Sequence, residues 1–162
     1  VFAGETIVSA EAQTHAWERH KAMERGAQES LLDGVPLALP ALTRAEKLQR
    51  RASRAGFDWP TIHGVSDKVE EELEELCREI ATGTDRDALV EEAGDLLFAA
   101  VNLLRHAGVD PESALRRGNA KFTRRFRGVE AMCAEAGRAV ADTDLDTLDA
   151  YWDTVKELEG NR

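Results

Sequence analysis

Three observations predict an all-α fold for this chain of 162 residues. Apolar residues recur with a period near 3.6, and no segment shows the two-residue alternation of a half-buried strand. Helix-capping patterns recur at regular intervals along the sequence. The connections between the expected helices are short, which favours antiparallel neighbours and therefore an antiparallel helical bundle.

Two helices are expected in the N-terminal part of the chain. A weakly amphipathic helix spans about residues 9–24, with Trp17 as its only large apolar anchor. After an irregular connection containing glycine and prolines, a basic helix runs from Thr43 to about Gly56. Its start is predicted by Thr43 and Glu46, which have the spacing of a capping box.

Four more helices are expected after the turn formed by Asp58, Trp59 and Pro60. The first is strongly acidic and the second is almost entirely apolar. A proline at the first helical position marks the start of the third. The expected ranges are 66–81, 86–106, 111–135 and 146–159, and the expected caps of the first three are Ser66 or Asp67, Thr84 with Asp87, and Asp110 before Pro111.

Composition narrows the class of protein. The formal net charge of -10 disfavours a nucleic-acid-binding surface. No apolar run approaches the ~18–20 residues of a membrane span, and no basic and then apolar leader is seen, so we expect a cytoplasmic protein with no membrane partner. Cys77 and Cys133 lack metal-ligand spacing and are expected to be reduced core thiols. The first residue, Val1, indicates a fragment or a processed product.

Two carboxylate pairs with i,i+3 spacing are the main functional signal: Glu72 with Glu75, and Glu92 with Asp95. On a helix, residues three apart share a face. The second pair belongs to an apolar helix that should be buried, and a buried carboxylate requires a compensating partner. Four carboxylates converging from two helices therefore predict a bound cation.

The ligand type indicates which cation is expected. Carboxylate oxygens suit a hard divalent ion, Mg²⁺ or alternatively Mn²⁺. Asn102 continues the polar stripe of Glu92 and Asp95, and the small Ala99 between them leaves room for a ligand. A di-iron centre is disfavoured because it needs Glu-x-x-His pairs, which are absent. Glu70 and Glu74 are expected to be ordinary solvated acids.

Two further pairs suit a phosphate-bearing ligand. Lys121 and Arg125 lie one helical turn apart, as do Trp152 and Lys156. Together with a carboxylate metal site they describe a nucleotide pocket, in which bases and metal hold the phosphates and the indole covers the base.

The stretches KVEEELEEL (68–76) and EEAGDLLFAAVNLLRHAGVDPESALRRGNAKFTRRF (91–126) resemble the MazG nucleoside triphosphate pyrophosphohydrolases. The resemblance extends back through LDGVPLALPALTRAEKLQRRASRAGFDWP (32–60) and forward to Trp152 and Lys156. It is to the C-terminal, catalytically competent half of two-domain members. It implies an N-terminal helical extension or connector over 1–58 and a MazG-like catalytic domain over 59–162.

The resemblance also implies a function and a set of site residues. The expected activity is Mg²⁺-dependent hydrolysis of an NTP or dNTP to the monophosphate and pyrophosphate by a homodimer. Glu71 is the first candidate to orient the attacking water. The expected metal ligands and catalytic residues are Glu72, Glu75, Glu92 and Asp95, with Glu71 as a further catalytic residue, and the expected substrate-binding residues are Lys68, Asn102, Lys121, Arg125, Trp152 and Lys156.

Two alternatives remain open from the sequence. One is a specialised relative, such as a dUTP/dCTP or phosphoribosyl-ATP pyrophosphohydrolase, which shares the acidic helices. The other is a non-catalytic helical dimerisation module whose acids only increase solubility. The second alternative predicts that Mg²⁺ changes neither thermal stability nor nucleotide affinity.

Overall fold

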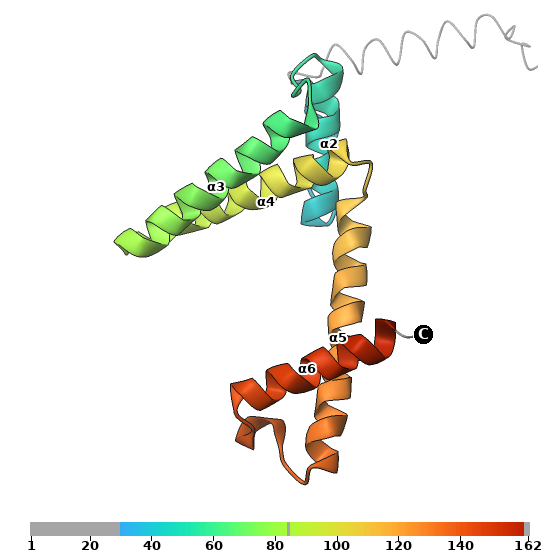
Figure 1. The fold of residues 1–162 in the computed structure, drawn as a ribbon. Coiled ribbons are helices and arrows are strands. Elements are labelled where there is room, and N and C mark those ends of the chain that lie inside the picture. Colours follow the sequence, from blue (N-terminus) through green and yellow to red (C-terminus); the bar gives the residue numbers. More distant parts are fainter. Residues whose placement is uncertain (1–29, 84, 161–162) are drawn as a thin grey trace, which may run out of the picture.

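A computed structural model describes residues 30–83 and 85–160, and this part of the chain is helical without strands (Figure 1). The predicted all-α class is therefore confirmed. The helix expected over 9–24 lies outside the described residues. No helix in the described ranges is long and apolar enough to cross a membrane. The elements are α2 (Ala41–Arg54), α3 (Ile62–Thr82), α4 (Arg86–His106), α5 (Pro111–Glu135), the short 3-10 helix η1 (Val140–Asp142) and α6 (Leu145–Gly160).

The acidic helix α3 begins at Ile62, earlier than the predicted start at Ser66 or Asp67, so that prediction is wrong. In the sequence, Gly64 suggests that the helix begins after this position. In the structure, Gly64 lies inside the helix and makes room for a neighbouring ring. A Cβ on Gly64 would lie 3.0 Å from the Trp59 ring, so the indole packs against the first turn. The Ser66 hydroxyl donates to the His63 carbonyl inside the helix, at 2.8 Å, and caps nothing.

The basic helix α2 also begins earlier than the capping pattern predicted. Its first residue is Ala41, and Pro40 occupies the N-cap position without a side-chain cap. The Arg44 N–H donates to the Pro40 carbonyl at 2.8 Å, which closes the first turn two residues before the end of the supposed capping box. Thr43 therefore lies within the helix.

The bounds of α4 and α5 match the predicted ranges. Asp110 caps α5 as predicted, because its side chain accepts a hydrogen bond from the Ser113 N–H at 2.6 Å and Pro111 follows it. Asp144 does the same for α6, accepting from the Thr147 N–H at 2.9 Å. These caps fix where the two C-terminal helices start.

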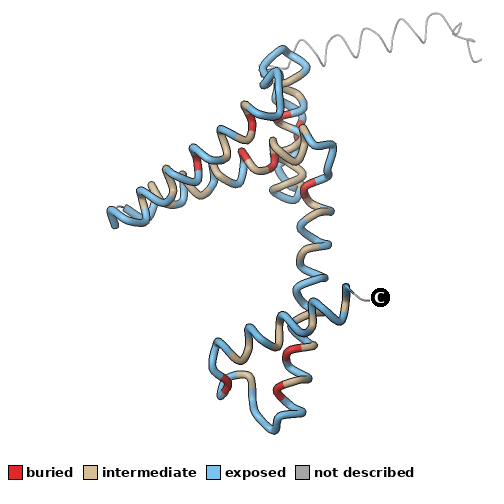
Figure 2. Tube along the Cα trace, viewed as in Figure 1, coloured by how far each residue is buried: buried red, intermediate tan, exposed pale blue. Residues whose placement is uncertain are grey.

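The helices form two pairs that meet near α2 (Figure 1). Helices α3 and α4 lie antiparallel along most of their length, whereas α6 crosses α5 in its C-terminal half. Helix α2 packs against α4 and α5 where the two pairs join. Few residues are fully buried (Figure 2). In the part of the chain that the structure describes, the buried apolar residues are Val35, Val65, Ala99, Val101, Val129 and Cys133.

Candidate metal centre

Three of the four predicted ligands come together between α3 and α4. Carboxylate oxygens of Glu72, Glu92 and Asp95 lie within 4.8 Å of one another. Glu72 is buried, Glu92 is half-buried and Asp95 is exposed, so the cluster opens to solvent on one side. The fourth predicted ligand, Glu75, is half-buried and does not belong to this group of three.

Helical periodicity explains this convergence. Glu72 and Glu75 lie on the face of α3 that packs on α4, while Glu92 and Asp95 share a face of the opposing helix. Ala99, one turn beyond Asp95 on the same helix, is buried.

The electrostatics of the cluster match a site for a cation. Burial raises the pKa of the Glu92 carboxyl, and so do the neighbouring charges of Glu75, Glu72, Asp95 and Glu79, in that order. The structure therefore places Glu75 close enough to act on Glu92 through space. A positive charge at this point would relieve the repulsion among the carboxylates.

Lys68 supplies one such charge within the chain. Its ammonium lies 2.6 Å from a Glu72 oxygen and 2.9 Å from a Glu71 oxygen. Its hydrogen bonds to Glu72 and then to Glu71 raise the pKa of Lys68. This predicted substrate-binding residue thus neutralises the buried carboxylate, whereas the Glu71 side chain is 57% exposed at the edge of the cluster.

The donor set fits a hard divalent cation. All its atoms are carboxylate oxygens, the ligands that Mg²⁺ and Mn²⁺ prefer. The three carboxylate oxygens lie within 4.8 Å of one another, so these residues could hold one such cation together.

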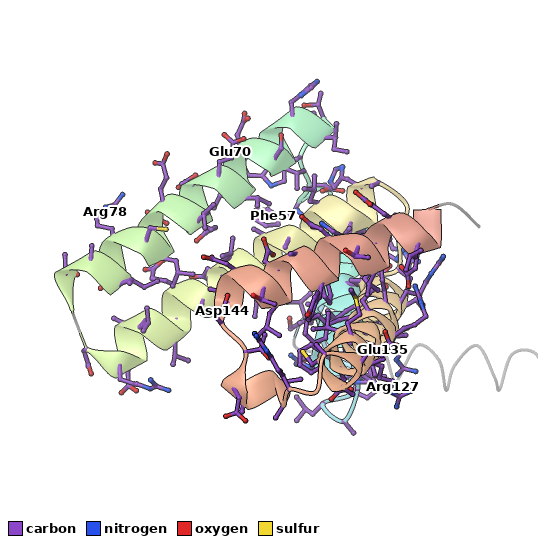
Figure 3. All side chains as sticks on the ribbon, turned by 60° about the horizontal axis from the view of Figure 1, so that its bottom comes forward. Phe57, Glu70, Arg78, Arg127, Glu135 and Asp144 are labelled. Carbon is purple, nitrogen blue, oxygen red and sulfur yellow. The ribbon has the colours of Figure 1, made fainter. Side chains whose placement is uncertain are left out.

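Glu79 was missed as a site residue by the sequence analysis. It acts on the Glu92 pKa through space, and its Oε2 atom is buried without a hydrogen-bond partner among the described residues. Its spacing of seven from Glu72 returns it to the same face of α3, which is the signal that could have identified it. By contrast, Glu70 and Arg78 lie on the side of α3 away from α4 (Figure 3). Glu70 is exposed, in line with the prediction of a solvated acid.

Asn102 lies on α4 two turns beyond Asp95. Its Oδ1 atom accepts two hydrogen bonds from Arg105, from Nε at 3.0 Å and from a terminal guanidinium nitrogen at 2.8 Å. The same terminal nitrogen lies 2.5 Å from an oxygen of Asp58, in the turn before α3. The sequence alone does not reveal this contact, because Asp58 and Arg105 are far apart along the chain.

A basic and aromatic cluster forms where α6 crosses α5. Arg125 lies over the Trp152 ring, 5.9 Å from its centroid. Its Nε donates to Glu159 at 2.8 Å, and Arg124 donates to the other oxygen of that carboxylate at 2.6 Å. Hydrogen bonds from Arg124 and then Arg125 lower the pKa of Glu159 to about 2.

The remaining two predicted phosphate-binding residues are exposed. Lys156 pairs with Asp153 at 2.5 Å on the surface of α6. Lys121 lines a groove on α5 and forms no ion pair among the described residues. The Phe122 ring on α5 lies 5.5 Å from the Trp152 ring on α6.

The structure thus divides the predicted site residues into two clusters. The acidic cluster and Asn102 belong to the α3–α4 pair, and the basic and aromatic cluster belongs to the α5–α6 pair. The two helix pairs lie apart in the molecule (Figure 1). One chain therefore presents the predicted metal ligands and the predicted phosphate-binding residues on separate arms.

Comparison with known proteins shows what this chain is similar to. The model of the MazG nucleotide pyrophosphohydrolase domain matches residues 61–129. The nucleoside triphosphate pyrophosphohydrolase of Escherichia coli strain K12 is 45% identical over 98% of this chain, which spans 62% of that protein's length. The nucleoside triphosphate pyrophosphohydrolase/pyrophosphatase MazG of Thermotoga maritima is 43% identical over 86% of this chain, which covers 54% of that relative.

Proposed function

Because this chain belongs to the MazG nucleotide pyrophosphohydrolase family, we propose that it hydrolyses nucleoside triphosphates to the monophosphate and pyrophosphate. The observation that carries this proposal is the convergence of three carboxylates from α3 and α4 within 4.8 Å. Glu72, Glu92 and Asp95 would hold a divalent cation, with Glu75 beside them. Mg²⁺ is the expected ion and Mn²⁺ a substitute.

The reaction follows from the chemistry of these groups. A bound cation would offset the negative charge of the triphosphate and lower the pKa of a water molecule. The water oxygen bonds to the α-phosphorus while the bond from that phosphorus to the bridging oxygen breaks, and pyrophosphate leaves. Glu71, exposed at the edge of the cluster, orients the water and accepts its proton.

The other predicted residues bind the substrate. Lys121, Arg125 and Lys156 contact phosphate oxygens, and the Trp152 indole stacks on the base. For Arg125 the substrate competes with Glu159, which holds the guanidinium in the structure. Lys68 exchanges its contact with Glu72 for a phosphate once a cation neutralises that carboxylate.

This assignment of roles implies a homodimer whose active site is completed by the second copy. In one chain the basic residues lie on the α5–α6 arm, apart from the carboxylates (Figure 1). Large apolar side chains on both arms are also exposed, which is typical of a surface that a partner covers. They include Leu73, Ile80, Leu97 and Phe98 on α3–α4, and Leu115, Phe122 and Phe126 on α5.

The proposed activity is tested by measuring pyrophosphate release from a panel of NTPs and dNTPs, including dUTP, dCTP and phosphoribosyl-ATP, with Mg²⁺ or with a chelator. We expect turnover only with the metal ion. Loss of a residue that only orients a metal ligand lowers activity by about 10–100-fold. Asp95→Ala removes an expected ligand itself, so it should lower turnover by more than that. Glu70→Ala, which removes an exposed acid from the outer side of α3, is the matched control and should be neutral. Near-normal turnover by Asp95→Ala would refute the metal assignment.

A further inference from the structure

The orientation of the Asn102 amide is fixed by Arg105. Two guanidinium nitrogens donate to Asn102 Oδ1, at 3.0 and 2.8 Å. A guanidinium has donors and no acceptor, so the oxygen of the amide and not its nitrogen must face Arg105. The Asn102 amide nitrogen consequently points away from Arg105, and it forms no hydrogen bond within the described ranges. Two N–H donors are therefore presented to a ligand.

Arg105 is itself held in place by the turn before α3. Its guanidinium lies 2.5 Å from Asp58 Oδ1, and the same oxygen lies 2.9 Å from His106 Nε2. The Arg105 side chain is only 11% exposed, so its charge needs this carboxylate as a partner. The hydrogen bond from Arg105 is also the main reason that the pKa of Asp58 falls to about 2. Asp58, Arg105 and Asn102 thus form a chain of contacts with one free end.

The free end lies on the same helix as two of the clustered carboxylates, Glu92 and Asp95. Asn102 is seven residues beyond Asp95, which corresponds to about 10 Å along the helix axis. Ligands of Mg²⁺ lie at about 2.1 Å, so Asn102 is too distant to coordinate the same ion. It is placed to meet another part of a substrate whose phosphates are held at the carboxylates.

The surroundings of Asn102 suit a nucleoside better than a phosphate. Asp58 neutralises the charge of Arg105, which leaves no net positive charge for an anion. Aromatic side chains are exposed in the adjoining turn before α3: Phe57 is 84% exposed and Trp59 45%. An aromatic surface and a neutral donor commonly bind an uncharged part of a ligand, which in a nucleotide is the nucleoside.

We propose that Asn102 donates from its amide nitrogen to an acceptor on the nucleoside part of the substrate, and that Arg105 and Asp58 are positioning residues that orient this amide. The inference rests on the proposed function for the location of the phosphates. It assigns the C-terminal end of α4 to the nucleoside and the carboxylate cluster to the triphosphate.

The test compares the affinities of two ligands in the presence of Mg²⁺, measured by calorimetric titration. One is a nucleoside triphosphate analogue with a methylene group between the α- and β-phosphorus, and the other is inorganic tripolyphosphate. We expect Asn102→Ala and Arg105→Leu each to lower the affinity for the analogue by about tenfold, which corresponds to the loss of one hydrogen bond. Both variants should bind tripolyphosphate as the unaltered protein does, because it has no nucleoside.

The double variant separates positioning from a general structural role. If Arg105 acts through Asn102, the double variant should bind the analogue no more weakly than Asn102→Ala alone. Arg105→Lys retains the charge beside Asp58 but lacks the two nitrogens that bind Asn102, so it should lower the affinity for the analogue while circular dichroism remains unchanged. This variant replaces Arg105→Leu in the experiment if Arg105→Leu does not fold. Arg50→Leu, which removes an exposed arginine paired with Glu46 on α2, is the control.

Any of three outcomes would overturn the inference. The variants could lose affinity for tripolyphosphate as much as for the analogue, the double variant could lose the sum of the two single losses of affinity, or the affinity for the analogue could remain unchanged. Failure of the proposed function would look different. An unaltered protein that binds the analogue but releases no pyrophosphate from any nucleoside triphosphate would refute the activity alone, and the affinities would still decide the role of Asn102. A protein that binds neither ligand would refute both.

Discussion

At the scale of single residues, the acidic cluster stores electrostatic repulsion that a cation can relieve. Burial and four neighbouring acids raise the pKa of Glu92. The only cation bound to the three converging carboxylates among the described residues is Lys68, which pairs with Glu72 and leaves Glu92 and Asp95 without a positive partner. The ionised form of Glu92 is therefore less favourable in the folded protein than in the unfolded chain.

Replacement of Glu92 by glutamine should therefore stabilise the metal-free protein. A carboxyl with a raised pKa in the folded state lowers stability as the pH rises above its ordinary pKa, and the loss is complete above the raised pKa; the neutral amide removes this effect. In thermal melts with a chelator, Glu92→Gln should unfold at a higher temperature than the unaltered protein. Added Mg²⁺ should raise the melting temperature of the unaltered protein but not that of the variant, because a ligand is missing.

The control is Glu74→Gln on α3, which removes an exposed acid outside the cluster and should alter neither melt. If Mg²⁺ left the melting temperature of the unaltered protein unchanged, the carboxylates would not form a metal site, and the non-catalytic helical module would be favoured.

The ion pair of Asp58 makes stability depend on pH in the acid range. The pKa of Asp58 falls from its ordinary value of 3.8 to about 2, chiefly through Arg105. Since the folded pKa is the lower one, the contribution is complete above the ordinary pKa and disappears as the pH falls toward 2. Near neutral pH it amounts to about 1–2 kcal/mol, because the Asp58 side chain is 27% exposed and partly screened.

Urea unfolding of Asp58→Asn at several pH values checks this expectation. The free energy of unfolding should be lower than that of the unaltered protein at neutral pH, and the difference should shrink from about pH 4 downward. A difference that persisted unchanged to about pH 2 would show that the ionised carboxylate is not responsible.

The spacing of the acidic residues alone predicts part of the site. Glu72, Glu92 and Asp95 converge as predicted because i,i+3 pairs on two packed helices face each other. Spacing does not predict the contacts that other residues make in and near this cluster. The contact from Lys68 to Glu72 depends on which rotamer a long side chain adopts, and Asp58 meets Arg105 only because of tertiary packing.

At the scale of elements, the crossing of α5 and α6 depends on a glycine. A Cβ on Gly128 would lie 2.8 Å from Val155 Cγ2, closer than side chains tolerate. Valine has a stiff β-branched side chain, so α6 itself would have to move away. The absence of a side chain at position 128 therefore sets how closely the two helices approach.

Gly128→Ala should destabilise the protein although alanine is the better helix former. Overpacking costs about 1–3 kcal/mol, which exceeds the about 1 kcal/mol gained in helix propensity. Gly118→Ala is a matched control on the same helix, because nothing lies within 4 Å of its added Cβ. Gly118→Ala should stabilise by about 1 kcal/mol in urea unfolding. Equal effects of the two substitutions would contradict the close approach of α6.

Element boundaries were predictable where a cap dictates them. Asp110 and Pro111 fixed the start of α5, as the sequence indicated. The start of α3 was mispredicted because Gly64 has opposite meanings in the sequence and in the fold. Locally it weakens a helix, but in the structure it accommodates the Trp59 ring. Only tertiary packing distinguishes these roles.

At the scale of the whole molecule, one chain leaves much apolar surface uncovered. Phe122 is 58% exposed and Leu97 is 60% exposed, on different arms of the molecule. The basic cluster of the α5–α6 arm also lies apart from the carboxylates that it is proposed to serve (Figure 1). The sequence predicted both clusters but not their separation, because the pattern on a helix face does not reveal which chain covers it.

A mixture of two inactive variants tests whether the second copy completes the site. Asp95→Ala removes a ligand from the acidic cluster, and Lys121→Ala with Arg125→Ala removes bases from the other arm. In a dimer whose two sites each combine arms of both chains, a mixed dimer has one site carrying both defects and one intact site. Chains unfolded together and refolded at equal amounts should therefore regain about a quarter of the unaltered activity, since half of the dimers are mixed.

The two variants refolded separately and combined afterwards are the control and should remain inactive unless subunits exchange. Sedimentation should find both variants dimeric, which ensures that activity is lost from the site and not from assembly. If the co-refolded mixture remained inactive although mixed dimers had formed, both arms of a site would belong to one chain. The α5–α6 arm would then have to fold back onto its own carboxylates, and the separation of the arms would describe an open form of the molecule.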